Sequence, residues 1–252
     1  MNNYKAVIEY DGTYFCGFQV QPKGLRTVQG EIEKALGKVF NERTRICYAG
    51  RTDAGVHAVN QVISFKSKEE LDLYRFKWSL NSIIPEDVCV KDIEKAAENF
   101  DARRSALWRE YKYYIVNGNY QSVFLKKYSI LVNKELDIRS MEKACLIFKG
   151  IKDFTSFSGP SEENKNKVRE VFECEIKEEN ICSNKVIVFK IKANAFLYNM
   201  ARIIAGTILE IGKGQRDEAS IYDAFKAKDR NFAGSIADAK GLFFTGAGYR
   251  VI

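Results

Sequence analysis

The stretch AGRTDAGVHA, residues 49–58, gathers residue types that could perform chemistry. The Asp53 carboxylate can serve as a covalent nucleophile at a sugar carbon, provided that it stays ionised in a shielded site. A neighbouring guanidinium favours the ionised form and offers bidentate hydrogen bonds, and Arg51 is the nearest candidate. Gly50 and Gly55 would let the backbone turn tightly and admit a bulky substrate. The same residues also suit a plain turn or a helix N-cap, so the pattern alone leaves both interpretations open.

A second candidate site is WREYKYYI, residues 108–115, in which aromatic and basic residues alternate. In a strand, Tyr111 and Tyr113 share one face and Lys112 lies on the other. One face could then stack on bases while the other meets phosphates. A strand of a packed core with exposed cations fits the same pattern, and the residues alone do not separate the two.

A third candidate is Arg202, which interrupts the apolar face of a helix predicted over residues 197–214. A charge at the margin of such a face needs a partner, because burying it unpaired is costly. The apolar face is formed by Phe196, Met200, Ile203, Ile204, Thr207, Ile208 and Ile211.

Several other chemistries lack the residues they need. A nucleophile–histidine–acid triad would have to use His57, the only histidine, which has no serine or cysteine elbow nearby. No phosphate-binding or dinucleotide-binding glycine motif follows a strand. A glycosidase normally needs a second carboxylate, and the nearest in a strong motif, Asp11 of EYDG, predicts a turn instead. Six scattered cysteines without a CxxC pair predict neither a zinc site nor disulfides, so no metal and no cofactor is expected.

The composition predicts a soluble globular protein with a polyanionic partner. The chain has 252 residues, 46% of them hydrophobic, and a formal net charge of +7. Scattered thiols suit a reducing compartment, so a cytoplasmic protein is expected. The opening residues MNNYKAVIEYDG predict a strand rather than an export signal, and no apolar run is long enough for a membrane span.

Hydrophobic periodicity predicts the elements that position the three candidate sites. Strands are predicted at 4–12, 44–50, 61–67 and 87–96, with helices at 27–40, capped by Thr27, and at 69–84, ended by Pro85. Asp53 then lies on a loop between strands. A similar series follows, with strands at 108–118, 169–178, 185–193 and 241–252 and helices at 137–150 and 197–214.

This order predicts an α+β fold of two similar mixed α/β halves, with antiparallel sheets flanked by helices and facing a central cleft. Residues 1–104 form the half that carries the Asp53 loop, and residues 105–252 form the half with the tyrosine strand and Arg202. The polar tract 161–170 predicts a solvated surface loop, whose Lys165, Lys167 and Arg169 could also hold phosphates.

The chain resembles the bacterial tRNA pseudouridine synthases of the TruA type nearly end to end. The resemblance is carried, in order, by EYDGTYFCGFQVQPKGLRTVQGEIEKAL, GRTDAGVHA, SLNSIIPEDVCV, FDARRSA, REYKYYI, DFTSF, FLYNMARIIAGTILEIGKG and AKGLFF. It implies the pseudouridine synthase fold, with an RNA-binding cleft, and a reaction that detaches uracil from its ribose, rotates it and rejoins it through carbon. It further implies a homodimer that binds the anticodon arm of tRNA, in the 3′ part of that stem-loop, without metal or cofactor.

The resemblance also assigns roles to residues. Asp53 is implied as the catalytic aspartate, which attacks either the ribose C1′ or the uracil C6. Tyr111 corresponds to the tyrosine that packs on the target base, Arg202 to the arginine that pairs with the aspartate, and Leu242 to an apolar residue of the base pocket. Arg51 is expected to fill the space that the flipped base leaves, and Arg103 of FDARRSA to bind the substrate RNA. His57 is expected to support the loop through hydrogen bonds.

Five positions depart from the family pattern, namely Phe18, Asp101, Arg104, Lys152 and Asp238. None is one of the three implied catalytic-site residues. The departures keep two alternatives open, which are a related synthase that modifies ribosomal RNA and an RNA-binding protein without catalytic activity.

Overall fold

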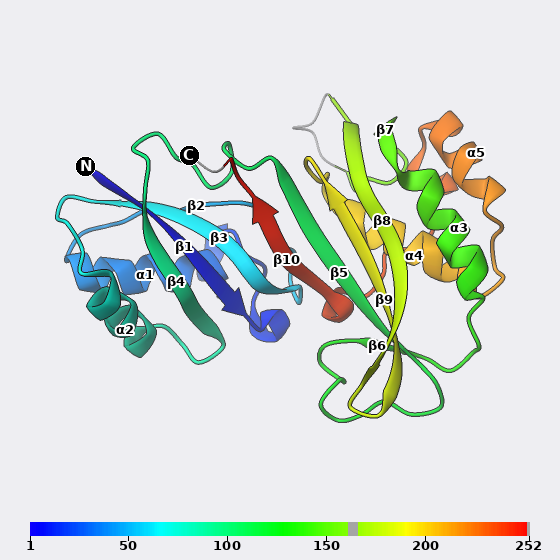
Figure 1. Cartoon of the computed structure of the whole chain (residues 1–252), viewed down its shortest axis with the longest axis horizontal. Coiled ribbons are helices and arrows are strands. Elements are labelled where there is room, and N and C mark those ends of the chain that lie inside the picture. Colours follow the sequence, from blue (N-terminus) through cyan, green and yellow to red (C-terminus); the bar gives the residue numbers. More distant parts are fainter. Residues whose placement is uncertain (161–165, 251–252) are drawn as a thin grey trace. The chain divides into compact units, whose positions relative to one another are not determined.

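The computed structural model describes residues 1–160 and 166–250, which form two compact units (Figure 1). Unit 1 consists of Met1–Arg109 and the C-terminal segment that begins at Phe243, and unit 2 is Glu110–Leu242. The predicted boundary after residue 104 lies close to the first of these divisions. The return of the C-terminal strand to unit 1 was not predicted, because residue order alone does not say which strands pair.

Unit 1 is built on a sheet whose strand order is β4-β1-β3-β10 (Figure 1). Its main strands are β1 (Asn2–Tyr10), β3 (His57–Ser67) and β4 (Val88–Ala96), paired antiparallel, with the short β2 (Cys47–Tyr48) beside β3. β10 (Leu242–Gly248) joins β3 in parallel, with Phe243 opposite His57. The two helices are α1 (Val28–Phe40), capped by the Thr27 side chain, and α2 (Leu73–Ile83), capped by Asp72.

An aromatic cluster fastens both helices of unit 1 to the sheet. The Phe65 ring of β3 lies 5.7 Å from that of Tyr4 on β1, 6.3 Å from Phe40 of α1 and 5.8 Å from Phe76 of α2. Tyr4, Phe65 and Phe76 are buried, and burying aromatic side chains of this size removes about 150–250 Å² each from water. Phe65 lies near the C-terminal end of β3, whereas the loop that carries Asp53 precedes the N-terminal end of this strand.

Unit 2 has a sheet of order β5-β9-β8-β7 and three helices (Figure 1). The strands are β5 (Trp108–Asn117), which begins in unit 1, β7 (Gly150–Asp153), β8 (Val168–Ile181) and β9 (Asn184–Ala193). β6 (Ile130–Val132) adds to β5 in parallel. The helices are α3 (Ile138–Phe148), α4 (Met200–Gly212) and α5 (Ala219–Ala227).

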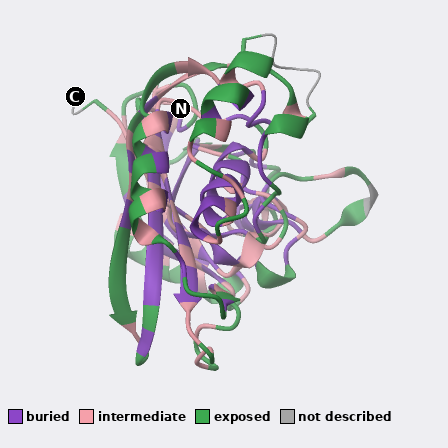
Figure 2. Cartoon of the chain, turned by 90° about the vertical axis from the view of Figure 1, so that its right-hand side faces the viewer, coloured by how far each residue is buried: buried purple, intermediate pink, exposed green. Residues whose placement is uncertain are grey.

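The core of unit 2 lies around α4 and a cluster of phenylalanine rings. Almost every residue of α4 is buried, whereas α3 and α5 expose their outer faces (Figure 2). Phe154 and Phe157 of the DFTSF motif contact Phe225 of α5 at 5.4 and 5.0 Å between ring centroids. Phe148 of α3 lies 5.0 Å from Phe157, so the motif serves as a hydrophobic anchor for two helices.

The structure confirms the α+β class and corrects several details. The helix predicted at 69–84 begins only at Leu73, because Asp72 caps it. The strand predicted at 61–67 starts earlier, at His57, while α5, β6 and β7 were not predicted. Two short parallel pairings accompany the expected antiparallel ones. Within the tract 161–170, residues 161–165, including Lys165, lie outside the described residues, and β8 begins at Val168.

Candidate functional site

Asp53 lies, as predicted, on the loop between β2 and β3. Its side chain is half-buried, and the neighbouring Thr52 is buried. The Val56 N–H donates to the Asp53 carbonyl at 3.2 Å, and Gly55 adopts a φ of +76° within this tight turn. The predicted turn is therefore present, and Asp53 is a half-buried residue within it.

The segment that follows β1 packs directly against this loop through two glycines. The Phe18 N–H donates to the Thr52 carbonyl at 3.0 Å. Gly17 has a φ of +93°, and a Cβ there would lie 3.1 Å from the Thr52 oxygen. A Cβ on Gly12 would lie only 2.0 Å from the Val56 carbonyl oxygen. Only glycine permits these approaches, so the backbone on both sides of Asp53 is fixed by backbone contact.

Gln61 and Tyr10 hold the loop from beneath. The buried Gln61 side chain bonds both backbone groups of Gly50, donating to its carbonyl at 2.7 Å and accepting from its N–H at 3.3 Å. The Tyr10 hydroxyl lies 2.7 Å from the Thr52 hydroxyl. Burial raises the pKa of Tyr10 far above its usual value, outweighing the hydrogen bonds with Thr52 and Gln61, so its phenol stays neutral.

His57 supports the same loop, as expected. Its Nδ1 lies 3.0 Å from the Gly12 nitrogen and 3.1 Å from Asp11 Oδ1. A backbone N–H can only donate, so Nδ1 is the acceptor of the Gly12 N–H. The imidazole also stacks on the Phe243 ring at 4.7 Å. Asp11 accepts the Thr13 N–H at 2.9 Å, which confirms the turn predicted for EYDG.

Two arginines for which the sequence predicts a role, Arg51 and Arg103, are exposed in unit 1. Arg51 donates from Nη1 to Gln19 Oε1 at 3.3 Å. Arg103 lies on a turn capped by Asp101, whose Oδ1 accepts the N–H groups of Arg103 and Arg104 at 2.8 Å each. Burial raises the pKa of the Asp101 carboxyl, but hydrogen bonds, first from the Arg104 N–H, bring it below its usual value. Asp101, a departure from the family pattern, is thus an ionised turn cap.

Tyr111 and Tyr113 share a buried face of β5, as the alternation predicted. The Tyr111 ring meets the edge of Phe196 at 4.8 Å between centroids. The Tyr113 hydroxyl donates to the Asp238 carbonyl at 2.9 Å, and burial raises the pKa of this phenol far above its usual value. This packing is compatible with a core strand and with a base-stacking strand. Tyr113 is fully buried in the core, and Tyr111 lies at its margin.

Arg202 lies in the first turn of α4 and contacts the segment that leads to Leu242. Its Nε donates to the Ala237 carbonyl at 2.9 Å, and its Nη1 lies 3.4 Å from Asn199 Oδ1. Leu242 is buried and begins β10, directly after the 3-10 turn Ala239–Gly241 that Asp238 caps. Arg202, Tyr113 and Leu242 are therefore linked within unit 2 by one segment of chain.

The sequence-predicted residues fall into two groups, each described within its own unit. Asp53, Arg51 and Arg103 belong to unit 1, whereas Tyr111, Arg202 and Leu242 belong to unit 2. The sequence analysis assigned no role to Gly12, Gly17, Gln61 or Tyr10. Tyr10, Gly12 and Gly17 lie within the EYDGTYFCGF motif, so the resemblance of this motif to the family pattern could have pointed to them.

The remaining departures from the family pattern occupy structural positions. Phe18 is fully buried, with its ring 4.5 Å from that of Tyr48. Lys152 lies on β7, with its ammonium 6.0 Å from the centre of the Phe225 ring. Within residues 1–160 and 166–250, no three His, Cys, Asp or Glu side chains gather closely enough to hold a metal ion. In those same ranges no helix is long and apolar enough to cross a bilayer.

A family model described as tRNA pseudouridine synthase matches residues 6–103 and 144–250. A protein named tRNA pseudouridine synthase A, from Caldicellulosiruptor saccharolyticus, is 41% identical over 249 residues, which are 99% of this chain and 100% of that protein. One of the same name from a Geobacillus species is 41% identical over 240 residues, 95% of each chain. The tRNA pseudouridine synthase A 1 of Bacillus cereus is 39% identical over 250 residues, 99% of each chain. The matched ranges of the family model contain Asp53, Arg103, Arg202 and Leu242.

Proposed function

Because the chain belongs to the tRNA pseudouridine synthase family, we propose that it modifies uridines of the tRNA anticodon arm with Asp53 as its catalytic group. The protein is an isomerase that converts uridine to pseudouridine in tRNA and has the pseudouridine synthase fold. The bond between uracil N1 and the ribose C1′ breaks, the base turns within the site, and a bond forms between C5 and C1′. The proton at C5 is lost and N1 gains one, so the atoms balance without a cofactor.

The fixed backbone around Asp53 is the observation that carries the catalytic assignment. A carboxylate nucleophile gains most from being held in place before the substrate arrives, because no reorganisation is then needed during the reaction. Glycine contacts, the Gln61 amide and the Tyr10 hydroxyl immobilise the loop, while the Asp53 side chain is left half-buried. Asp53 attacks either the ribose C1′ or the uracil C6 of the target nucleotide.

Four other side chains complete the proposed site. Tyr111 packs on the target base and assists removal of the proton at C5, and Leu242 lines the base pocket. Arg202 pairs with the Asp53 carboxylate, and a guanidinium suits this task because it binds a carboxylate bidentately. Arg51 fills the space that the base leaves when it is flipped out of its stack.

The substrate accounts for the surface charge. The net charge of +7 suits a polyanion, and Arg103, exposed on its turn, contacts the RNA backbone. Two subunits form the surface on which the tRNA lies, and the enzyme works in the cytoplasm, where tRNA is processed.

Pseudouridine mapping on tRNA tests the proposal. The purified protein is incubated with unmodified tRNA, and pseudouridine is located by carbodiimide treatment and primer extension. Wild-type protein should modify uridines of the anticodon arm. Asp53→Asn should bind tRNA with unchanged affinity but lose at least about a thousandfold in rate, since removing a catalytic nucleophile has effects of this size.

A matched control is Asp223→Asn, which neutralises an exposed carboxylate on α5 and should leave the rate unchanged. Activity retained by Asp53→Asn would remove Asp53 from the chemistry. Modification confined to another arm of the tRNA, or to ribosomal RNA alone, would contradict the proposed substrate site.

A further inference from the structure

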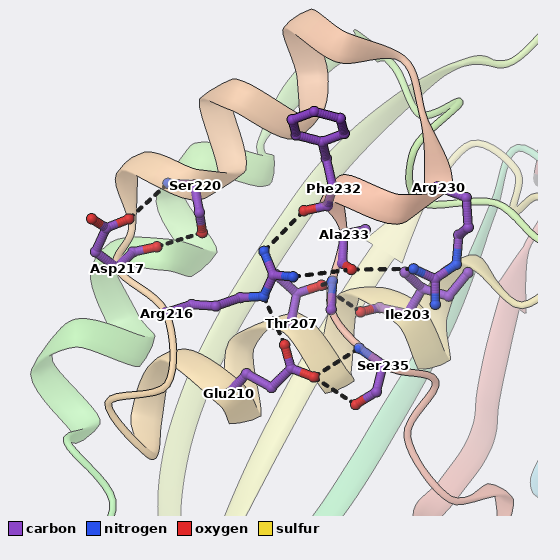
Figure 3. A network of polar contacts seen from close by, with 11 residues as sticks. Ile203, Thr207, Glu210, Arg216, Asp217, Ser220, Arg230, Phe232, Ala233 and Ser235 are labelled. Carbon is purple, nitrogen blue, oxygen red and sulfur yellow. Dashed lines mark hydrogen bonds and ion pairs between the residues drawn. The ribbon is translucent and has the colours of Figure 1, made fainter.

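Residues 230–238, called the strap from here on, contact one face of α4 at several points. Figure 3 shows the part of the strap that contacts Glu210 and Arg216. The strap crosses α4 so closely that a Cβ on Gly206 would lie 1.9 Å from the Ser235 carbonyl oxygen. Conversely, a Cβ on Gly234 would lie 2.6 Å from Thr207 Cα. A glycine within a helix costs about 1 kcal/mol relative to alanine, so its presence here is explained by this backbone approach.

Polar contacts fix the strap to the same face of α4. Thr207 Oγ1 accepts the Gly234 N–H at 3.0 Å. Glu210 Oε1 accepts both the Ser235 N–H, at 2.8 Å, and its hydroxyl, at 2.6 Å. Positions 206, 207 and 210 lie on one side of the helix because of its period of 3.6 residues.

Arg216 completes the attachment from the turn after α4 (Figure 3). Its Nε donates to Glu210 Oε2 at 2.7 Å, while Nη1 and Nη2 donate to the carbonyls of Phe232, at 2.9 Å, and Ala233, at 3.3 Å. Burial raises the pKa of the Glu210 carboxyl, but the bonds from Ser235 and Arg216 bring it below its usual value, so it is ionised at neutral pH. One carboxylate and one guanidinium thus hold four strap groups, which belong to Phe232, Ala233 and Ser235.

The strap in turn reaches the residues assigned to the base pocket. The Ala237 N–H donates to the Arg202 carbonyl at 3.1 Å, and the Ala237 carbonyl accepts Arg202 Nε at 2.9 Å. The Asp238 carbonyl accepts the Tyr113 hydroxyl, and a Cβ on Gly241 would lie 2.7 Å from the Tyr113 ring. Leu242 follows at once, so the Arg202 guanidinium and the Leu242 side chain both depend on where the strap lies.

We propose that Glu210, held by Arg216, is a positioning residue that sets the strap along α4 and thereby aligns Arg202 and Leu242 for the reaction. This proposal rests on the proposed function for its catalytic consequence. The hydrogen bonds of Glu210 and Arg216 go to each other and to the strap, so the alignment should matter for the rate of the bound complex rather than for tRNA affinity. A displacement of about 1 Å at a reacting group can cost about a hundredfold in rate.

The test combines kinetics with amide hydrogen exchange measured by mass spectrometry. Glu210→Ala should lower kcat about ten- to a hundredfold with KM for tRNA within about twofold, and should speed amide exchange in residues 232–238 at least about tenfold. Glu210→Gln should recover most of both, because an amide oxygen still accepts from Ser235. Combining Glu210→Ala with Arg216→Ala should add little to either effect, since the two side chains act as a unit.

Glu178→Ala is the matched control, because it removes an exposed carboxylate that pairs with Lys185 at 2.6 Å, and it should change neither readout. Unchanged exchange in the strap of Glu210→Ala overturns the proposal, and so does an effect confined to KM. If Glu210→Ala does not fold, Arg216→Lys is judged by the same two readouts, at smaller amplitude. If wild-type protein forms no pseudouridine, the proposed function fails, whereas strap exchange still decides whether Glu210 positions the strap.

Discussion

The loop that carries Asp53 in unit 1 and the strap that holds Arg202 in unit 2 are positioned by different means. Around Asp53, backbone lies against backbone at Gly12 and Gly17, and the supporting side chains of Tyr10 and Gln61 are neutral and buried. Along the strap, an ion pair between Glu210 and Arg216 is combined with hydrogen bonds from a helix face. The Asp53 loop is thus fixed by backbone contact and neutral hydrogen bonds, whereas the segment beside Arg202 combines close glycine contacts with an ionic network.

These two means differ in how they respond to change. A steric contact between backbone atoms has no adjustable part, so a single added methyl group must displace the loop. A polar network distributes its stabilisation over several bonds worth about 1 kcal/mol each, and the loss of one leaves the others. An added methyl group in the unit 1 loop should therefore act abruptly, whereas removal of a polar side chain along the strap should act gradually.

Gly12→Ala should have the largest effect on stability. Its Cβ would lie 2.0 Å from the Val56 carbonyl oxygen, which is backbone and cannot rotate away. We expect a loss of about 3 kcal/mol in the free energy of unfolding, at the upper end for overpacking, and a large fall in kcat. Gly118→Ala is the control, since no atom lies within 4 Å of its Cβ. If the two variants unfold at the same urea concentration, the Asp53 loop can move to accommodate the added methyl group, and its backbone is not fixed by the contact at Gly12.

Gln61→Leu should have the next largest effect. It removes both hydrogen bonds to the backbone of the half-buried Gly50 and leaves that N–H and carbonyl beside an apolar side chain. An unsatisfied buried group costs about 1–3 kcal/mol, so we expect a loss of about 2 kcal/mol together with a lower kcat. Chemical denaturation and tRNA kinetics measure the two effects. Gln215→Leu, at an exposed position, should be nearly neutral. If Gln61→Leu is as stable as wild type but has a reduced kcat, the geometry of the loop affects the rate independently of global stability.

Much of the fold could be predicted from the sequence where periodicity is long and a cap is present. Helix 27–40 with its Thr27 cap and the alternation of Tyr111 and Tyr113 on β5 are examples that the structure confirms. The shorter α5 and the strands β6 and β7 were missed, because fewer turns or residues give a weaker pattern. The parallel pairing of β10 with β3 is a contact between residues distant in sequence, which no local pattern encodes.

The candidate site was predictable in its chemistry but not in its support. The Asp53 loop was recognisable from residue types and from the family resemblance. The role of Gln61 depends on the place of β3 beneath the loop, and that of Gly12 on a close approach to Val56, neither of which can be seen in one dimension. The assignment of Arg202 and Leu242 to the reaction stays a prediction, for which the strap variants provide the test.

Glu173→Gln should have the smallest effect and should show it through pH. Hydrogen bonds from Lys190, at 2.5 Å, and Lys192, at 2.9 Å, lower the pKa of this β8 carboxyl from 4.5 to about 2. A lowered pKa contributes stability that is present above about pH 4.5 and is lost as the pH falls toward 2. Because the side chain is 39% exposed, we expect a difference below about 1 kcal/mol between wild type and variant at pH 6, vanishing near pH 2 and shrinking in high salt. If the difference in unfolding free energy between wild type and Glu173→Gln stays constant from pH 6 to pH 2, the ionic contribution is contradicted. Protection of amides against exchange should accordingly weaken first in β8 and β9 of unit 2 as the pH falls from about 4.5 toward 2, while the neutral contacts around Asp53 keep their protection.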